Sequence, residues 1–243
     1  MRLAAIETST PWCSVALWSD GELAALERFA GQRHSELVLP MLESLFKDGK
    51  IEIDAVAGTG PGGRVTRADV DALHQRVQRA GCRVIFAPKN LDGFGGGYGF
   101  RFFTPDGLPF EISSDVQRGI ARRIAPREAV PEKISHIVMH SPDHQAATRF
   151  FVDVLGFRIS DWLGDFMSFL RCNEWHHRIA FLPGPPCLNH VAYDMANVDE
   201  MMRGVAKLRR KEVELRWGPG RHTAGNNTFS YFCTPNGFAV EYT

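Results

Sequence analysis

The sequence predicts an α+β fold made of repeated β-α-β-β-β units, and three observations support this prediction. The segments V-D-A-L-H-Q-R-V at 70–77 and V-D-E-M-M-R-G-V at 198–205 lie 128 residues apart, and both have the pattern of an amphipathic helix that begins with an aspartate. Similar hairpin turns, T-P-D-G at 104–107 and T-P-N-G at 234–237, follow later in each copy. A third copy lies between these two.

The elements of the two outer copies follow one another in the same order. After each helix come an apolar run typical of a strand and a Gly-rich turn region, at 93–99 and at 218–221. An aromatic strand (F-R-F-F or F-S-Y-F), the hairpin turn and a last strand (F-E-I or V-E-Y) complete the copy. Each outer copy is therefore predicted to be a β-α-β-β-β unit.

The middle copy has the same order of elements. I-S-H-I-V-M-H-S at 134–141 is typical of a strand, and the segment 146–155 is typical of a helix that ends at Gly156. Three short strands, F-R-I-S, F-M-S-F-L-R and H-R-I-A-F-L, precede P-G-P-P at 183–186. Two such units paired about a pseudo-twofold axis would form a half-open barrel.

Composition indicates an ordinary globular protein. The 243 residues are 44% apolar and carry 28 basic and 28 acidic side chains, so no net charge favours nucleic acid or an anionic membrane as partner. The five cysteines are scattered and form no C-x-x-C pair, which fits a reducing cytoplasm. No apolar run is long enough for a membrane span.

Two histidines and a glutamate occupy related positions in the last two copies. His136 and His190 each lie in the first strand of their copy, and Glu241 lies in the last strand of the final copy. Two imidazoles and one carboxylate on one face of a metal leave the other face open, as in non-haem iron(II) oxygenases. Core histidines bonded to the backbone are the competing interpretation. Glu111 corresponds to Glu241 in the first copy but has no matching histidine, so we expect it to be structural or vestigial.

Residues from about 68 to 243 resemble the vicinal oxygen chelate superfamily, and specifically its type I extradiol ring-cleaving dioxygenases. The segments that carry the resemblance are I-S-H-I-V-M, N-E-W-H-H-R-I-A-F, L-N-H-V-A-Y-D, G-P-G-R-H-T and F-S-Y-F-C-T-P-N-G-F-A-V-E-Y. The resemblance implies an iron(II) site, with Mn(II) as an alternative metal, held by His136, His190 and Glu241.

The same resemblance implies catalytic roles for three further residues. His177 would match the family's acid/base histidine, which takes a proton from a catechol and later returns one. His222 and Tyr231 would match groups that hydrogen-bond substrate and oxygen. Relatives often carry an acidic residue shortly after the histidine of G-R-H-T, where this chain has A-G-N-N at 224–227. We expect no role for His140 and His144, which are predicted on the loop and helix after the first strand.

The amino-terminal region has a different character. M-R-L-A-A-I-E-T-S-T-P-W-C-S-V-A-L-W, with Q-R-H-S-E-L-V-L-P-M-L at 32–42, resembles the start of the TsaB-type protein of tRNA threonylcarbamoyladenosine synthesis, in which the helix after the strands helps dimerise. Residues 51–70 resemble part of a peripheral subunit-binding domain. Such a mosaic fits a fusion, a recombined sequence or an artificial one. The predicted domains are a mosaic segment (1–67), a remnant of a non-catalytic βαβββ domain (68–130) and a metal-binding catalytic domain of two units (131–243).

The glycines at 58, 60 and 63 fit G-x-G-x-x-G, the pattern of a dinucleotide-binding loop. Pro61 stiffens this loop, and no carboxylate ends a second strand about 20 residues later, so we reject that interpretation. Thr66 and Asp69 instead have the spacing of a capping pair that begins the helix at 70–77.

The leading hypothesis is an iron(II)-dependent extradiol dioxygenase that cleaves a substituted catechol such as 2,3-dihydroxybiphenyl. Its partners would be a small aromatic diol and dioxygen, and we expect a cytoplasmic homo-oligomer that binds neither nucleic acid nor membrane. Two alternatives stay open at this point. One is a non-catalytic interaction protein that associates through its amino terminus, and the other is a lyase or isomerase of the same superfamily.

Overall fold

The computed structural model describes residues 2–7, 12–19, 22–29, 41, 64–117, 119–120 and 122–243. The chain divides into two compact units, Met1–Asp54 and Ala55–Thr243. The helix expected at 32–42 lies outside the described residues except for Met41, and the glycine pattern at 58–63 lies outside them entirely. No helix among the described residues is long and apolar enough to span a membrane.

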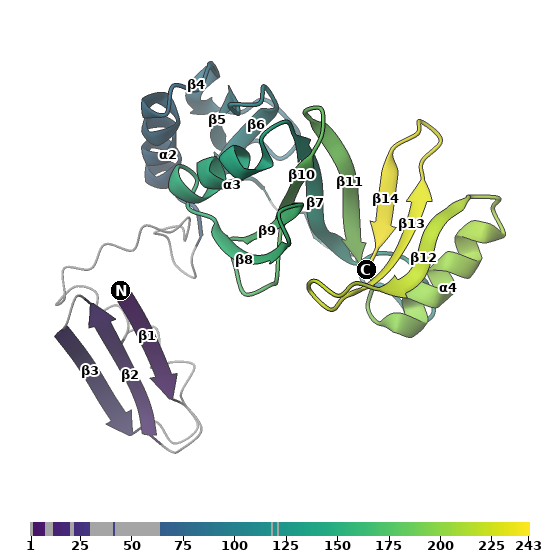
Figure 1. Cartoon of the computed structure of the whole chain (residues 1–243), viewed down its shortest axis with the longest axis horizontal. Coiled ribbons are helices and arrows are strands. Elements are labelled where there is room, and N and C mark those ends of the chain that lie inside the picture. The colour runs from purple at the N-terminus through teal and green to yellow at the C-terminus, as the bar shows by residue number, and fades with distance from the viewer. Residues whose placement is uncertain are drawn as a thin grey trace. The chain divides into compact units, whose positions relative to one another are not determined.

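The described elements alternate between short strands and three amphipathic helices (Figure 1). The strands are β1 (Arg2–Glu7), β2 (Trp12–Ser19), β3 (Glu22–Phe29), β4 (Val84–Asn90), β5 (Tyr98–Phe103), β6 (Pro109–Ser114), β7 (Lys133–Ser141), β8 (Arg158–Leu163), β9 (Met167–Arg171), β10 (Ile179–Pro183), β11 (Cys187–Asp194), β12 (Leu215–Arg221), β13 (Thr228–Cys233) and β14 (Ala239–Tyr242). The helices are α2 (Arg67–Arg79), α3 (His144–Asp153) and α4 (Val198–Arg209).

The first unit contains an antiparallel sheet of three strands in the order β1-β2-β3. Strand β1 pairs with β2 over its whole length, and β2 pairs with β3 from Trp12 to Ser19. Strand β1 and all but the last residue of β2 therefore lie within residues 1–18, the segment that resembles the start of the TsaB-type protein.

The last two copies of the repeat form one sheet of eight strands, in the order β12-β13-β14-β11-β7-β10-β9-β8. In each copy the first strand pairs in parallel with the fourth, β7 with β10 and β11 with β14. The two copies join where β7 and β11 pair antiparallel. The β-α-β-β-β order predicted for these copies is confirmed, and the junction brings their two first strands side by side in the middle of the sheet (Figure 1). The turn region predicted at 218–221 is wrong, because these residues belong to β12, where Gly220 and Arg221 pair with Phe229 and Thr228 of β13.

The first copy consists of α2 and a separate antiparallel sheet, β4-β5-β6. Any strand that precedes α2 falls before residue 64 and outside the described residues. The capping pair is confirmed, because the Thr66 hydroxyl accepts from the Asp69 backbone N–H and the Asp69 carboxylate accepts from the Thr66 N–H.

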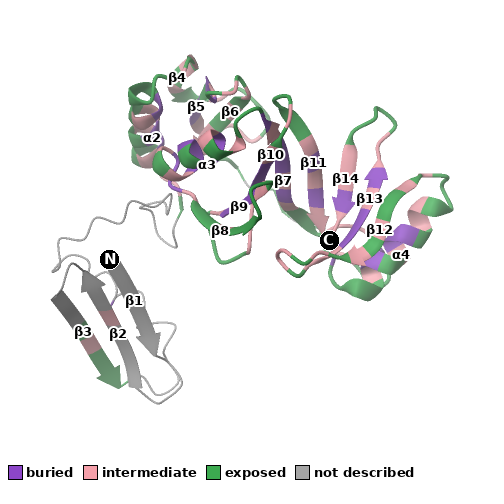
Figure 2. Cartoon of the chain, in the orientation of Figure 1, coloured by how far each residue is buried: buried purple, intermediate pink, exposed green. Residues whose placement is uncertain are grey.

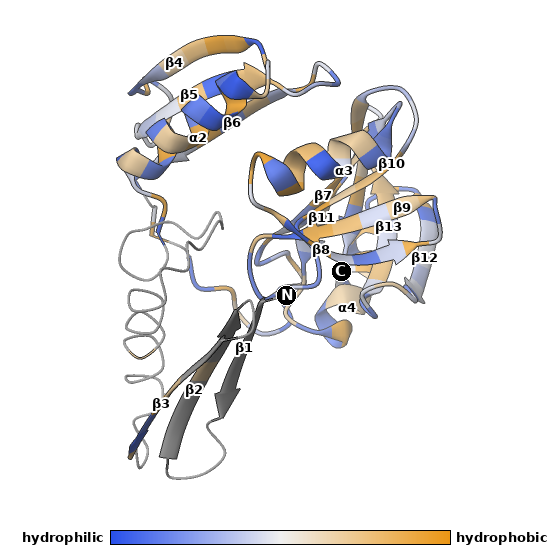
Figure 3. Ribbon diagram, turned by 60° about the vertical axis from the view of Figure 1, so that its left-hand side comes forward, coloured by the Kyte–Doolittle hydropathy of each residue, from blue (hydrophilic) through white to orange (hydrophobic). Residues whose placement is uncertain are grey.

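A glycine ends α3, as the sequence predicts, and an asparagine caps the start of α4. Gly156, with φ of +77°, follows α3, and a backbone N–H of Phe157 reaches back to the carbonyl of Phe151. Asn197 caps the start of α4, where its side chain accepts from the N–H of Glu200. Figure 3 shows polar and apolar stretches alternating along α2 and α3, as expected for helices with one face on a core.

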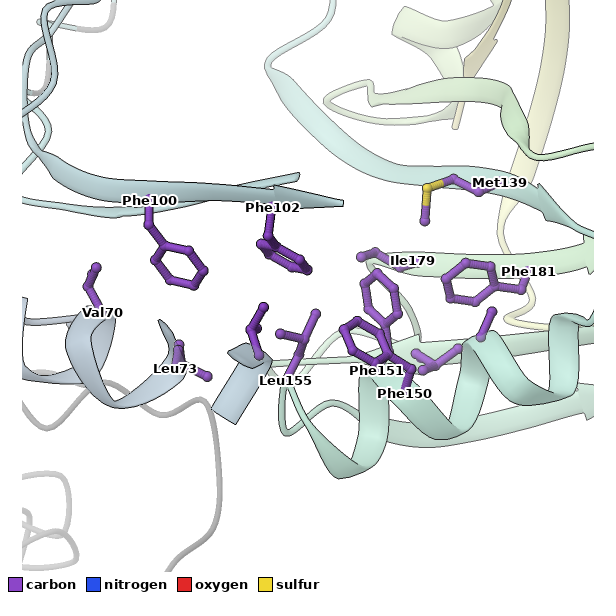
Figure 4. Close-up of a cluster of buried hydrophobic side chains, with 13 residues drawn as sticks. Val70, Leu73, Phe100, Phe102, Met139, Phe150, Phe151, Leu155, Ile179 and Phe181 are labelled. Carbon is purple, nitrogen blue, oxygen red and sulfur yellow. The ribbon is translucent and has the colours of Figure 1, made fainter. Parts of the chain in front are cut away.

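One hydrophobic core joins α2 and its sheet to α3 and β10 (Figure 4). Phe151 of α3 is 1% exposed, and its ring lies 4.9 Å from that of Phe181 and 5.4 Å from that of Phe110. Phe100 and Phe102 of β5 extend this core toward Val70 and Leu73 of α2. The core holds the middle copy of the repeat against the first one, across the boundary expected near residue 130.

Candidate metal centre

The strand register places three expected ligands on one face of the sheet. Glu241 of β14 pairs with Ala192 of β11, and Ala192 pairs with His136 of β7, so these residues form a row across three strands. His190 lies two residues before Ala192 and therefore points to the same face. The small side chain of Ala192, which is fully buried, leaves space above itself for the three larger groups.

The three side chains converge at short distances. The Nε2 atoms of His136 and His190 lie 3.2 and 3.1 Å from Oε2 of Glu241, and one ligand atom from each residue lies within 4.8 Å of the others. All three residues are buried, Glu241 completely. Figure 2 shows buried stretches along β7 and β11, the strands that carry the two histidines. Backbone-bonded core histidines, the competing interpretation, would not turn their Nε2 atoms toward one carboxylate.

The polar atoms at this point lack hydrogen-bond partners of normal geometry. Three buried atoms there have no such hydrogen-bond partner, although they lie close together: Nε2 of His190 and both carboxylate oxygens of Glu241. A buried polar atom without a partner costs free energy, so three of them facing one point indicate that another group belongs there. Two imidazole nitrogens and a carboxylate oxygen are a donor set that suits a divalent transition metal.

The surroundings keep Glu241 ionised. Burial opposes ionisation, but interactions with His136, His190 and His222 outweigh it and hold the pKa of the carboxyl well below its usual range. Glu111, the counterpart in the first copy, instead pairs with Arg101 on the surface at 2.7 Å. The structural role expected for Glu111 fits this geometry.

His177 stands directly beside the cluster, just before β10. Its ring centre lies 4.1 Å from that of His136, and its Nδ1 lies 2.9 Å from Nδ1 of His176. Burial, followed by the neighbouring His136 and His176, lowers the pKa of His177 to about 3, so its ring is neutral near pH 7. Nε2 of His176 lies 3.6 Å from the exposed Asp161, which links this pair of histidines to the surface.

His222 and Tyr231 lie on the other side of Glu241. Tyr231 pairs with Glu241 across β13 and β14, and its hydroxyl lies 3.1 Å from Nε2 of His222. The same nitrogen is 3.4 Å from Oε1 of Glu241. Burial, followed by the charge of Glu241, raises the pKa of Tyr231, so the hydroxyl stays protonated and can donate.

The A-G-N-N segment holds His222 through its backbone. The N–H of His222 donates to the carbonyl of Asn227, and the Asn227 side chain donates to the hydroxyl of Thr243. Gly225, with φ of +75°, lets the loop approach His176, since a Cβ there would lie 3.0 Å from the ring. This loop therefore positions His222 without the acidic residue that the resemblance led us to expect.

A cavity of about 390 Å³ opens onto these side chains. His136, His190, His177, His222 and Tyr231 all contribute to its wall. The rest of the wall is mainly apolar and comes from Val138, Leu163, Phe166, Met167, Phe169, Leu182, Trp217 and Ala224, with Asn189, Thr223 and Asn227 as its polar members. A flat, largely apolar molecule with a polar edge suits this cavity, its polar edge meeting the histidines.

Sequence reasoning missed two polar neighbours of the ligands. His140, expected on a loop, lies in β7, and His144 is the first residue of α3. Asn189 directly precedes His190, and its side chain contacts both His190 and His140. The adjacency of Asn189 and His190 was visible in L-N-H-V, but the approach of His140 depends on strand pairing.

Comparisons with known proteins agree with the fold, and two family models match separate parts of the chain. Residues 133–242 match the Glyoxalase/Bleomycin resistance protein/Dioxygenase superfamily. Residues 40–71 match the e3 binding domain, which agrees with the resemblance to a subunit-binding domain. The resemblance of residues 1–50 to a TsaB-type protein stays a prediction.

Two relatives each match 72% of this chain. Metapyrocatechase 2 from Cupriavidus necator is 27% identical over 72% of this chain and 60% of its own length. Biphenyl-2,3-diol 1,2-dioxygenase from Paraburkholderia xenovorans (strain LB400) is 32% identical over 72% of this chain and 65% of its own length. The chain thus spans less than two thirds of these relatives.

Solved structures share the fold. The Mn(II)-bound glyoxalase from Novosphingobium aromaticivorans is 67% identical, with a TM-score of 0.72, over 73% of this chain and 59% of that chain. The 2,3-dioxygenase LapB from Pseudomonas sp. KL28, at 24% identity and a TM-score of 0.62, covers 72% of this chain and 67% of its own and supports the fold alone.

Proposed function

We propose that this chain, whose residues 133–242 match the glyoxalase and dioxygenase superfamily, is an extradiol dioxygenase that cleaves a substituted catechol with dioxygen. The convergence of His136, His190 and Glu241, with the two histidines in the wall of a largely apolar cavity, carries the proposal. The similarity to biphenyl-2,3-diol 1,2-dioxygenase and to metapyrocatechase 2 supports the reaction and the class of substrate.

The three residues would hold iron(II) or manganese(II). Their donor set fits either ion, and a Mn(II)-bound relative at 67% identity supports manganese as well as iron. A divalent ion bound there supplies Lewis acidity toward the catechol oxygens and, as iron(II), redox chemistry with dioxygen.

The protein's own side chains would bind the catechol and move its protons. Nδ1 of His177 is engaged with His176, so Nε2 is the nitrogen free to accept a proton from a catechol hydroxyl and to return it later. The contact from His176 to Asp161 gives that proton a route to solvent. The low pKa of His177 keeps the ring neutral and able to accept a proton once negative charge develops beside it.

Tyr231 and His222 would steady charge on the oxygen atoms. The protonated Tyr231 hydroxyl is a donor, and its contact with His222 fixes where it points. Phe169, Leu182 and the other apolar residues of the wall would receive the substituent of the ring and exclude water from the reacting edge.

Oxygen uptake tests this proposal. Protein loaded anaerobically with Fe(II) or Mn(II) is mixed with 2,3-dihydroxybiphenyl, 3-methylcatechol or catechol, and both dioxygen consumption and the yellow ring-opened product are measured. We expect uptake with a substituted catechol, and its loss in Glu241→Gln but not in Glu111→Gln. Absence of uptake and of yellow product with all three compounds would overturn the proposal.

The 67% identical Mn(II)-bound glyoxalase favours a second candidate, a lyase or isomerase of the same superfamily that uses a divalent metal. Neither of these reactions consumes dioxygen. Protein that binds Mn(II) stoichiometrically but takes up no dioxygen with any catechol would favour this candidate. Protein that binds no metal would favour the interaction protein instead.

A further inference from the structure

A chain of hydrogen bonds runs outward from one expected metal ligand. Nδ1 of His190 lies 2.6 Å from Oδ1 of Asn189, and Nδ2 of Asn189 lies 2.7 Å from Nε2 of His140. Nδ1 of His140 in turn lies 3.1 Å from the backbone carbonyl oxygen of Pro183. Four residues from β7, β10 and β11 are thus connected through polar contacts.

The last member of the chain selects one tautomer of a neutral His140. The Pro183 carbonyl can only accept, so a neutral His140 carries its proton on Nδ1 and offers a lone pair on Nε2. The amide nitrogen of Asn189 must then face that lone pair, which turns its oxygen toward His190. His190 therefore donates from Nδ1 when a metal is bound, and its Nε2, which lies 3.1 Å from Oε2 of Glu241, is the nitrogen that would offer its lone pair to the metal.

The backbone is arranged to make these contacts. The register between β11 and β7 shifts between Leu188 and His190, so Asn189 is the additional residue of a β-bulge. A bulge redirects a side chain, and here it lets two consecutive residues touch through their side chains. At the other end Gly184 leaves room for His140, because a Cβ there would lie 2.6 Å from Nδ1 of that ring.

We propose that Asn189 and His140 are positioning residues that set the tautomer and ring orientation of His190 for metal binding. Groups that accept the second ring N–H of a ligating histidine fix its orientation and make the other nitrogen a better donor. This inference deepens the proposed function, because it rests on the metal centre formed with His136 and Glu241. His140, for which the sequence indicated no role, would act on the metal ligand His190 through Asn189.

Metal affinity is the measurement that tests the inference. Titration calorimetry with Mn(II) gives the dissociation constant of wild-type protein and of each variant, independent of turnover. Asn189→Leu removes the acceptor for His190, and we expect it to weaken Mn(II) binding about 10- to 100-fold. His140→Phe keeps a ring but removes the partner that orients Asn189, so it should weaken binding in the same direction and by less.

Coupling between the two sites separates positioning from a general loss of packing. If both residues act through one chain of hydrogen bonds, the double variant should bind Mn(II) no more weakly than Asn189→Leu alone. Asn189→Asp retains an oxygen acceptor for His190 and should bind Mn(II) at least as tightly as wild type. Additive losses, or an Asn189→Asp variant as weak as Asn189→Leu, would overturn the inference.

His144→Phe is the matched control. His144 also bonds to a backbone carbonyl, that of Asp165 at 2.8 Å, but none of its contacts described here reaches a ligand. Its Mn(II) affinity should equal that of wild type, and circular dichroism should show all variants folded. Wild-type protein that binds Mn(II), with Asn189→Leu binding it equally well, would overturn this inference alone. Wild-type protein that binds no Mn(II) would overturn the metal centre as well.

Discussion

Replacing Glu241 by glutamine should abolish most of the stabilisation that a bound metal gives. Glu241 is fully buried and is the one carboxylate that lies against both His136 and His190 among the described residues. A ligand at 100 times its dissociation constant stabilises the folded state by about 2.7 kcal/mol. For a chain of this size that corresponds to a rise in melting temperature of about 5–11 °C.

The glutamine keeps the shape of the side chain but removes its charge. Two unit charges about 4 Å apart at an effective dielectric constant of about 20 attract by about 4 kcal/mol, which exceeds the 2.7 kcal/mol of a 100-fold change in affinity. A 100-fold weaker site at the same Mn(II) concentration retains about 0.4 kcal/mol, or about 1–2 °C.

Thermal unfolding followed by circular dichroism, with and without Mn(II), measures the rise in melting temperature for wild type and for Glu241→Gln. Glu111→Gln is the matched control. Glu111 lies in the strand after the hairpin turn of the first copy, as Glu241 does in the last copy, but its contact is an ion pair with Arg101. Glu111→Gln should retain the full rise in melting temperature that Mn(II) gives wild-type protein. A rise in Glu241→Gln equal to that of wild type would refute the assignment of Glu241 as a ligand.

Three further predictions concern the acid/base residue and the core. His177→Gln should lower kcat about 10²–10⁴-fold while Mn(II) affinity stays unchanged, and a parallel loss of affinity would contradict a proton-transfer role. Because the folded-state pKa of His177 is about 3, below the usual 6.5, its contribution to stability is present above pH 6.5 and is lost as the pH falls. Metal-free wild type should therefore lose about 2 kcal/mol more than His177→Gln between pH 7.5 and 5 in urea denaturation, and equal losses would contradict the shift. Phe151→Ala should lower the free energy of unfolding by about 3–5 kcal/mol, against less than about 0.5 for the exposed Phe94→Ala, and similar values would mean that Phe151 does not pack as described.

The sequence was most informative where a local pattern determines the structure. The capping pair at Thr66 and Asp69, the glycine that ends α3 and the T-P-[DN]-G turns each depend on residues a few positions apart. The repeat then made His136 and His190 comparable, because equivalent strands of a repeated unit occupy equivalent places. The proposed role of His177 came from the family resemblance, and the structure adds its contact with His136.

Strand pairing decided what local patterns could not. Ala192 forms the space beneath the three ligands only because β14, β11 and β7 pair in one register, and shifting that register by one residue would turn the side chains to the other face. His140 and Asn189 are 49 residues apart in sequence. Their contact exists because two antiparallel first strands meet in the middle of the sheet and a bulge redirects one side chain. The sequence by itself therefore determined the candidate ligands, whereas the tertiary structure decided how His190 is oriented to face Glu241.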